Sequence, residues 1–447
     1  MKTRSHVLAF LLLILLAPLP AAAGGLAEAV DAELPALLET YRHFHANPEI
    51  SYFERETSRL VAGRLRELGF EVAEEVGDYG VDGRVSYGLV AVLENGDGPT
   101  VMVRTDLDGL PIEEKTGLPW ASRAQQTTES GAEVFTMHAC GHDLHMTSFL
   151  GTAAMLSARR DDWSGTLVMI GQPAEERGAG ARAMLDGGLY ENFPKPEVVL
   201  GLHTNASLAA GRIGLVPGYA LANVDSVDIT VRGAGGHGAY PHTTKDPVTL
   251  AALLVTNLQT IVSRQVSPLD PAVITVGSIH GGTKHNIIPD EVKLQLTVRS
   301  YRPEVRRYLL DAIRRTAEET ARAAGFPDDL LPVVIQHDEE YTPSTYNDPA
   351  LVERLTALFS GVLGEEAVLT MQPVMGGEDF SRYALEGEIP INIFWLGAVD
   401  PEKVRHAKET GATLPSLHSS EFAPLPEPAI RTGVLAMTSA VLDLMAK

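Results

Sequence analysis

Short apolar runs that alternate with helical stretches limit most strongly what this chain can fold into. Runs this short and continuous are typical of strands buried on both faces of a sheet. Between the second and third run, His142–Arg159 has the apolar spacing of a helix. Strands that alternate with helices predict an α/β fold with a doubly wound, mostly parallel sheet. The expected strands are Leu89–Leu93, Thr100–Arg104, Thr166–Gly171 and Val198–Leu202.

A second pattern interrupts the first near Pro217–Gly218. Its elements follow the order βαββαβ, which predicts a small α+β domain with an antiparallel sheet and two helices on one face. After Tyr341–Pro343 the α/β pattern resumes with the apolar run Ile391–Leu396. We therefore expect an inserted domain at residues 218–342 within a larger domain of residues 24–217 and 343–447. The insert is expected to contain strands Ser226–Val231, Ala272–Ile279, Val292–Ser300 and Val333–Ile335 and helices Pro247–Arg264 and Pro303–Ala324.

Residues 1–23 have the pattern of a secretory signal peptide. Lys2 and Arg4 precede the apolar run Val7–Leu16, and three alanines end at Ala23. The stretch Val7–Ala23 is shorter than the roughly 20 apolar residues that a membrane span needs. We expect cleavage near Ala23 and no stable membrane insertion afterwards, with an uncleaved anchor as the alternative. The sequence thus predicts an exported protein, periplasmic or secreted.

Composition excludes two further classes. The 447 residues include 36 basic and 58 acidic side chains, so the formal net charge is −22. Binding to nucleic acid needs clustered Lys and Arg, so we expect no nucleic-acid partner. The single cysteine, Cys140, excludes an internal disulfide framework.

The strongest chemical signal is the segment His138–His145, which contains three histidines, Cys140 and Asp143. Cys140 and His142 lie two residues apart and a carboxylate follows. Together they form a compact set of ligands and supporting groups for a divalent metal. The alternative is a buried free cysteine beside incidental histidines. So many donors in one short segment favour the metal site.

A pair of carboxylates, Glu175 and Glu176, follows the expected strand Thr166–Gly171. Adjacent carboxylates cannot share one orientation, so one can bind a metal while the other faces the water that the metal activates. His203 and Asp106 also come at the ends of apolar strands, where open α/β sheets place their ligand sites. His418 is a lone histidine late in the chain, and its context alone gives it no function.

These motifs resemble those of the co-catalytic metal hydrolase family that includes aminoacylase and carboxypeptidase G. They are most similar to its amidohydrolase branch, with hippurate hydrolases and indoleacetyl-amino-acid hydrolases. The resemblance covers nearly all of the chain after residue 23. Besides the segments around Cys140 and Glu175, it includes Phe44–Glu49, Arg104–Asp108, Gly235–His237, Asn286–Asp290, Gly376–Phe380 and Leu417–His418.

The resemblance assigns roles around the metal site. It implies that Glu175 is the general base and that Asp108 orients a ligand. Asp106 stands where many relatives have a ligating histidine, and it is left outside the ligand set. The implied metal ligands are Cys140, His142, Glu176, His203 and His418.

The resemblance also assigns roles within the insert, which it implies is a dimerisation and lid domain. His237 matches a histidine that reaches the active site of the partner subunit in a homodimer. Asn286 and Arg299 match residues that hold the backbone and the carboxylate of the substrate. An anionic substrate needs a fixed guanidinium partner. The alternatives are a turn residue in a Gly-rich loop for His237 and a solvated strand end for Arg299.

The expected function is that of a metal-dependent amidohydrolase acting on a small anionic N-acyl amino acid or a related conjugate. Two divalent ions, zinc or manganese with cobalt and nickel also fitting, would polarise the carbonyl and lower the pKa of a bridging water. Glu175 would take that water's proton. A dipeptidase or carboxypeptidase at the same site is the alternative. The presence of Glu175 disfavours a non-catalytic exported metal- or ligand-binding protein.

Two stretches depart from the pattern of the amidohydrolase branch. Ala124–Thr136, before the metal motif, is longer than usual, and Thr204–Ala210 follows His203. Both are candidates to line the pocket. The identity of the substrate therefore stays open.

Overall fold

The computed structural model describes the backbone of residues 22–447, and side chains from residue 25. The expected signal peptide therefore lies almost wholly outside the described residues. Helix α1 (Ala22–Ala46) is the first element. Among the described residues, no helix combines the length and the apolar character that crossing a membrane requires.

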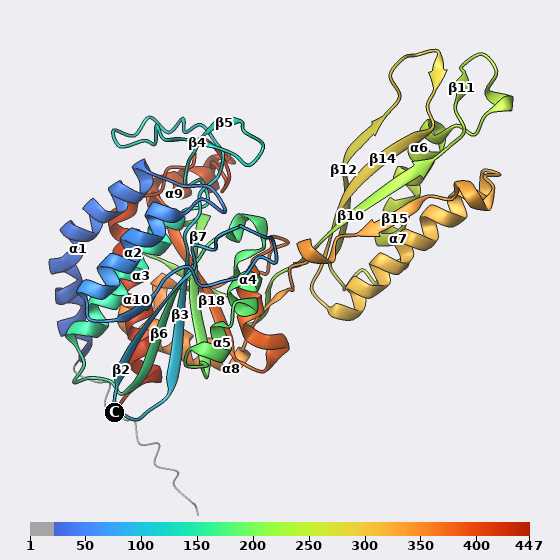
Figure 1. Ribbon diagram of the computed structural model, residues 1–447. Helices are drawn as coiled ribbons and strands as arrows, with labels where there is room; N and C mark the ends of the chain where they lie inside the picture. Colours follow the sequence, from blue (N-terminus) through green and yellow to red (C-terminus); the bar gives the residue numbers. More distant parts are fainter. Residues whose placement is uncertain (1–21) are drawn as a thin grey trace, which may run out of the picture.

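The described chain forms a larger unit (residues 22–221 and 343–447) and an inserted unit (residues 223–342), which stand side by side in Figure 1. The sheet of the larger unit has the strand order β1-β2-β6-β3-β7-β18-β8-β17. Its centre, β6-β3-β7-β18, is parallel, and β2 joins β6 in antiparallel orientation. The predicted mostly parallel sheet is confirmed. Its strands are β1 (Glu71–Ala73), β2 (Leu89–Asn95), β3 (Thr100–Asp106), β6 (Gly165–Gln172), β7 (Val198–Ala209), β8 (Ile213–Leu215), β17 (Val368–Thr370) and β18 (Ile391–Val399).

Helices cover both faces of this sheet, which explains the unbroken apolar runs. Val101 and Val103 of β3 pack into one hydrophobic cluster, whereas Met102 between them packs into another. The first cluster lies under α2 (Arg55–Glu67), α3 (His142–Ala158), α8 (Pro349–Leu363) and α10 (Pro426–Leu444), and the second lies under α4 (Gly180–Asp186) and α5 (Leu189–Asn192). Because both faces are buried, successive residues along the central part of a strand are mostly apolar.

The inserted unit has an antiparallel sheet in the order β12-β14-β10-β15. Its strands are β10 (Asn223–Arg232), β12 (Ala272–Gly281), β14 (Glu291–Ser300) and β15 (Val333–Gln336), and its long helices are α6 (Pro247–Thr260) and α7 (Pro303–Ala323). Alternate strand residues such as Ile229 and Leu294 pack under the helices. The expected βαββαβ order is therefore present.

The boundary expected after residue 217 is wrong by one short strand. β9 (Gly218–Leu221) pairs with β16 (Thr345–Asn347), and its Leu221 packs into the same cluster as Phe380. These contacts place Gly218–Leu221 in the larger unit. The inserted unit begins with β10, and on its other side Thr342 still pairs with Val224.

Candidate active site

The residues with metal-binding side chains converge at the carboxyl ends of the parallel strands, where open α/β sheets place their sites. β3 ends at Asp106, and Glu175 follows the end of β6. His142 begins α3, directly after Gly141, whose φ of 83° is left-handed. A side chain on Gly141 would meet Thr204 Oγ1 at 2.5 Å. The glycine thus lets the metal motif approach β7 closely.

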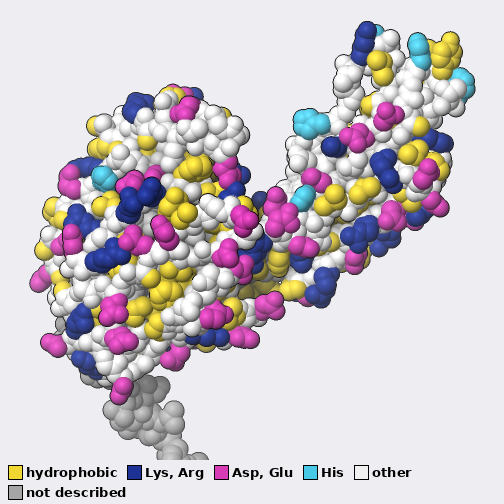
Figure 2. Space-filling view, in the orientation of Figure 1, with side chains coloured by type: hydrophobic (Ala, Val, Ile, Leu, Met, Phe, Trp, Pro, Cys, Tyr) yellow, Lys and Arg dark blue, Asp and Glu magenta, His cyan; other side chains and the backbone are white. Residues whose placement is uncertain are grey.

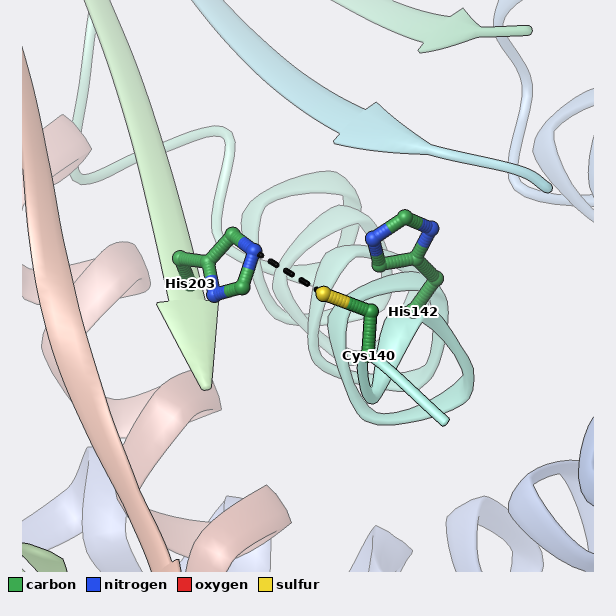
Figure 3. Close-up of side chains that lie close together, drawn as sticks. All are labelled: Cys140, His142 and His203. Atoms are coloured by element: carbon green, nitrogen blue, oxygen red, sulfur yellow. Dashed lines mark hydrogen bonds between the residues drawn. The ribbon is translucent and has the colours of Figure 1, made fainter. Parts of the chain in front are cut away.

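The structure brings the five predicted ligands together from four separate segments. In Figure 3 the sulfur of Cys140 points toward His203, and the ring of His142 lies beside it. Cys140 Sγ is 3.6 Å from His203 Nε2 and 3.3 Å from His418 Nε2. Glu176 Oε2 lies 3.4 Å from the same nitrogen of His418. Each of three overlapping groups has its donor atoms within 4.8 Å of one another, namely Cys140/His142/His203, Cys140/Glu176/His418 and His142/Glu175/Glu176.

The hydrogen bonds around this cluster leave its donor atoms free to bind a metal. His142 Nδ1 donates to the carbonyl oxygen of Asp108 at 2.7 Å, and His203 Nδ1 donates to that of Thr204 at 2.8 Å. In each ring the lone pair is therefore left on Nε2, the nitrogen that faces the cluster. Within the described chain, the buried atoms His142 Nε2 and Glu176 Oε1 have no hydrogen-bond partner. Thiolate, imidazole and carboxylate donors suit a borderline divalent cation.

The electrostatics agree with this fit. Burial raises the pKa of the Cys140 thiol, and the charges of Glu176 and Glu175 raise it further. Burial also raises the pKa of Glu176 to about 7. The protein alone thus disfavours the deprotonated donors that a metal needs. A divalent cation between them would reverse this balance.

Asp108 contacts two of the predicted ligands, Glu176 and His142. Its Oδ2 accepts from Ser51 Oγ at 2.6 Å and from the backbone N–H of Glu176 at 3.0 Å. Its Oδ1 is 3.4 Å from His142 Nδ1. This placement supports the predicted role of orienting a ligand.

Asp106 is held by other residues. Arg104 Nη1 donates to one oxygen at 2.7 Å, and His145 Nδ1 donates to the other at 2.8 Å. Arg104 also donates to Glu378 at 2.8 Å and is only 2% exposed. Sequence reasoning assigned no function to Arg104, His145 or Glu378. An arginine within an otherwise apolar strand was the signal that could have drawn attention to this network.

Glu54 is another residue that sequence reasoning missed. Its fully buried carboxylate accepts through one oxygen, Oε1, from the backbone N–H of Tyr52 at 3.0 Å and from that of Ala174 at 2.7 Å. Tyr52 and Ala174 have left-handed φ values of 74° and 49°, which are strained for residues with side chains. Glu54 therefore holds the segment that immediately precedes Glu175. No local pattern marks this role, because the two ends of the contact are far apart in the sequence.

The cleft beside the cluster is about 1230 Å³ and is lined by both units. Glu175, His203 and His418 come from the larger unit, and Ser226 and Arg299 come from the inserted unit. Arg299 Nη1 donates to the carbonyl oxygen of Met375 at 2.8 Å. The structure thus brings Arg299 to the cleft, as expected of a group that holds the substrate.

His237 and Asn286 are not brought to this cleft. They lie in the exposed ribbon of β11 (Gly236–His237) and β13 (Ile287–Ile288), where Gly238 N donates to the carbonyl oxygen of Asn286 at 2.9 Å. Figure 1 places this ribbon at the far end of the inserted unit. The role predicted for His237 concerns the active site of the partner subunit, and that of Asn286 concerns the substrate's backbone; both stay predictions.

Comparisons with known proteins agree with this geometry. Residues 102–418 match the model of "Peptidase family M20/M25/M40". An N-acetylcysteine deacetylase of Bacillus subtilis is 33% identical over 394 residues, which cover 87% of this chain and 96% of that protein. Thermostable carboxypeptidase 2 of Saccharolobus solfataricus is 34% identical over 403 residues, 90% of this chain and 93% of that protein. The crystal structure of the YXEP protein of Bacillus subtilis, described as a dinuclear metal binding peptidase, superimposes with a TM-score of 0.73 at 28% identity and covers 93% of this chain and 99% of that one.

Proposed function

The chain belongs to the peptidase family M20/M25/M40, as its motifs predicted, and from this premise we propose that it cleaves the amide bond of N-acyl amino acids or related small conjugates. It is a metal-dependent hydrolase of amide bonds. One observation carries the substrate proposal: the cleft combines the donor cluster and Glu175 with Arg299 on its other wall. The deacetylase among the relatives supports this choice.

The residues that would hold two divalent ions are Cys140, His142, Glu176, His203 and His418. When bound, such ions polarise the scissile carbonyl and lower the pKa of water. Zinc suits the mixed donors best, and manganese is the second candidate. The protein's part is to keep both histidine rings oriented through Asp108 and Thr204.

Glu175 performs the proton transfer. Its carboxylate borders the cleft, and burial together with the charges of Glu378 and Glu176 raises its pKa. A raised pKa makes a carboxylate a better base. Glu175 takes the proton of the attacking water and later passes it to the nitrogen of the leaving amine. Arg299 holds the carboxylate of the substrate by charge-assisted hydrogen bonds.

A substrate panel tests this proposal directly. Enzyme of defined metal content is assayed on N-acetyl amino acids, N-benzoyl amino acids and dipeptides. We expect the acyl amino acids to be the better substrates, a chelator to abolish cleavage, and added metal to restore it. Faster cleavage of dipeptides would favour the peptidase alternative, which the carboxypeptidase relative supports. Activity that resists the chelator would contradict the metal mechanism.

The proposal includes a homodimer formed through the inserted unit. Histidine and apolar side chains gather at the far end of this unit (Figure 2), where Tyr240 and Ile287 are exposed. If the ribbon reaches the partner's cleft, His237 can donate to the oxyanion that forms as water attacks, a contact worth about 2–4 kcal/mol in comparable sites. Asn286 would contact the substrate's backbone from the same ribbon.

Mixing two inactive variants tests this assembly. Glu175→Gln and His237→Ala dimers are combined and allowed to exchange subunits. A mixed dimer holds one site with both residues intact, so random pairing restores at most about one quarter of wild-type activity. No recovery despite proven exchange would remove His237 from the partner's site.

Export completes the proposal and rests on the first 23 residues. Mass spectrometry of the protein recovered from a bacterial periplasm or medium should show an N-terminus near Gly24. An intact Met1 there would contradict cleavage.

A further inference from the structure

A second cavity of about 600 Å³ opens next to the donor cluster. It shares Tyr52, Glu176 and Arg177 with the main cleft, so the two spaces meet beside a predicted ligand. Its lining comes wholly from the larger unit and combines apolar side chains with polar ones, such as Thr128 and Ser130. The apolar side chains are those of Ile50, Phe53, Leu110, Pro111, Ala132 and Val134.

A hairpin forms the roof of this cavity. It consists of β4 (Gln125–Thr127) and β5 (Glu133–Phe135), within the stretch that departs from the amidohydrolase branch. At its base, Gln126 Oε1 accepts from the backbone N–H of Ile50 at 2.8 Å, and Thr136 Oγ1 donates to the carbonyl oxygen of Pro48 at 2.8 Å. These bonds tie both legs of the hairpin to the loop below it.

The tip of the hairpin is held as well. Glu129 pairs with Arg84, whose guanidinium lies 4.4 Å from the centre of the Tyr52 ring. The ring of Tyr79 meets that of Tyr52 edge-on at 5.1 Å. Tyr52, in its strained left-handed conformation, is thereby fixed at the border between the two cavities. Because the hairpin is fixed at its base and its tip, the pocket is preformed. A ligand can therefore bind without the entropy cost of ordering the hairpin.

The position of this cavity indicates which part of the substrate can enter it. In the proposed reaction the scissile amide lies at the donor cluster, and the substrate's carboxylate lies on Arg299 of the inserted unit. The acyl group must then leave the cluster on the side away from Arg299. The second cavity meets the main cleft at Glu176, and neither Arg299 nor any other residue of the inserted unit lines it, so this cavity is the space beside the cluster that can receive the acyl group.

We propose that this cavity is an acyl pocket and that the enzyme prefers N-acyl amino acids with an apolar acyl group longer than acetyl. This inference rests on the proposed function, which it makes more specific. Its apolar side chains can cover an extended alkyl or aromatic acyl group, which buries more of this surface than acetyl does.

Two substrate series test the inference. In one, the amino acid is constant and the acyl group grows from acetyl through butanoyl to hexanoyl. In the other, the acyl group is acetyl and the amino-acid side chain varies. Each methylene that enters the pocket should raise kcat/KM about fourfold, as expected for burial of apolar surface.

Val134→Trp fills the pocket from the roof and should lower the hexanoyl-to-acetyl ratio of kcat/KM at least tenfold. Phe135→Trp is the matched control, because Phe135 is the next residue of β5, does not line the cavity and is 38% exposed. It should keep the wild-type ratio. Ala132→Trp, near the hairpin tip, gives a second filling variant that does not alter β5.

The outcomes separate the pocket from the reaction itself. Cleavage of acetyl substrates with no gain for longer acyl groups would overturn the acyl pocket and leave the proposed function standing. A change confined to the amino-acid series in Val134→Trp would overturn it too, since the cavity would then hold the leaving side chain. If the wild-type enzyme cleaved neither series, the proposed function would fail first.

Discussion

Replacing Glu54 tests how the fold positions the general base. In Glu54→Ala the backbone N–H groups of Tyr52 and Ala174 lose their shared acceptor. Each buried donor left unpaired costs about 1–3 kcal/mol, so the two together cost roughly 2–6 kcal/mol. Relaxation of the two left-handed residues returns about 1–3 kcal/mol each. That return is also roughly 2–6 kcal/mol in total, so the two effects largely cancel and the free energy of unfolding should change by less than about 4 kcal/mol in either direction.

Activity should fall further than stability alone explains. Ala174 immediately precedes Glu175, so relaxation at Ala174 moves the base. A displacement on the order of 1 Å typically costs about 10²-fold in rate. We therefore expect kcat of Glu54→Ala to fall about 100-fold at temperatures where the variant is folded, with its metal content unchanged.

Glu54→Gln and Glu49→Ala separate positioning from stability. Burial and the nearby charge of Asp108 raise the pKa of Glu54, so a neutral amide that keeps an acceptor oxygen should retain kcat within a few-fold. Glu49 accepts from the backbone N–H of Thr57 at 2.7 Å at the start of α2 and does not contact Ala174. Its removal should cost about 1 kcal/mol and leave kcat unchanged. Urea unfolding, steady-state kinetics and metal analysis measure these quantities. The reasoning is refuted if folded Glu54→Ala keeps its kcat, or if Glu54→Gln is equally impaired.

Three further predictions concern the site and its support. Glu175→Gln should lower kcat by about 10²–10⁴-fold with two metal ions still bound, and near-normal turnover would show that Glu175 is not the base. Glu176→Gln should instead lower metal occupancy, as measured by elemental analysis, and full occupancy would exclude it as a ligand. Burial opposes protonation of His45, but hydrogen bonds to Asp143 and Glu114 outweigh it and raise the pKa of His45 to about 9. The stability from this pair of contacts is fully present below pH 6.5 and is lost as the pH rises through 9, by about 3 kcal/mol in all. Urea unfolding across this range should show a shallower loss in His45→Gln, and equal slopes would contradict the assignment.

The sequence by itself determined the layers of the fold and the main metal motif. Burial on both faces forces continuous apolar runs, so β2, β3, β6 and β7 begin within one residue of the expected positions. Helical spacing likewise located α3. The donors of residues 138–145 are close in sequence, so their closeness in space needed little further information. Local chemistry is enough for features of this kind.

The domain boundary and the supporting contacts were decided only by the tertiary structure. β9 is a short strand of four residues without a distinctive pattern, and its pairing with β16 joins segments more than 120 residues apart. The bond from Ala174 to Glu54 spans 120 residues, and that from Arg104 to Glu378 spans 274. A single buried carboxylate or guanidinium has no periodicity, so nothing near it in the sequence reveals its partner.

The tertiary structure also decided which residues of the insert reach the cleft, a point that the resemblance alone left open. The resemblance assigned functions to both Arg299 and His237, yet β14 carries Arg299 to the cleft, whereas the ribbon carries His237 away from it. The second cavity likewise exists only because the β4–β5 hairpin is bonded across the loop at residues 48–53. Which side chains face a common space depends on how distant segments pack, and this packing is a property of the whole fold.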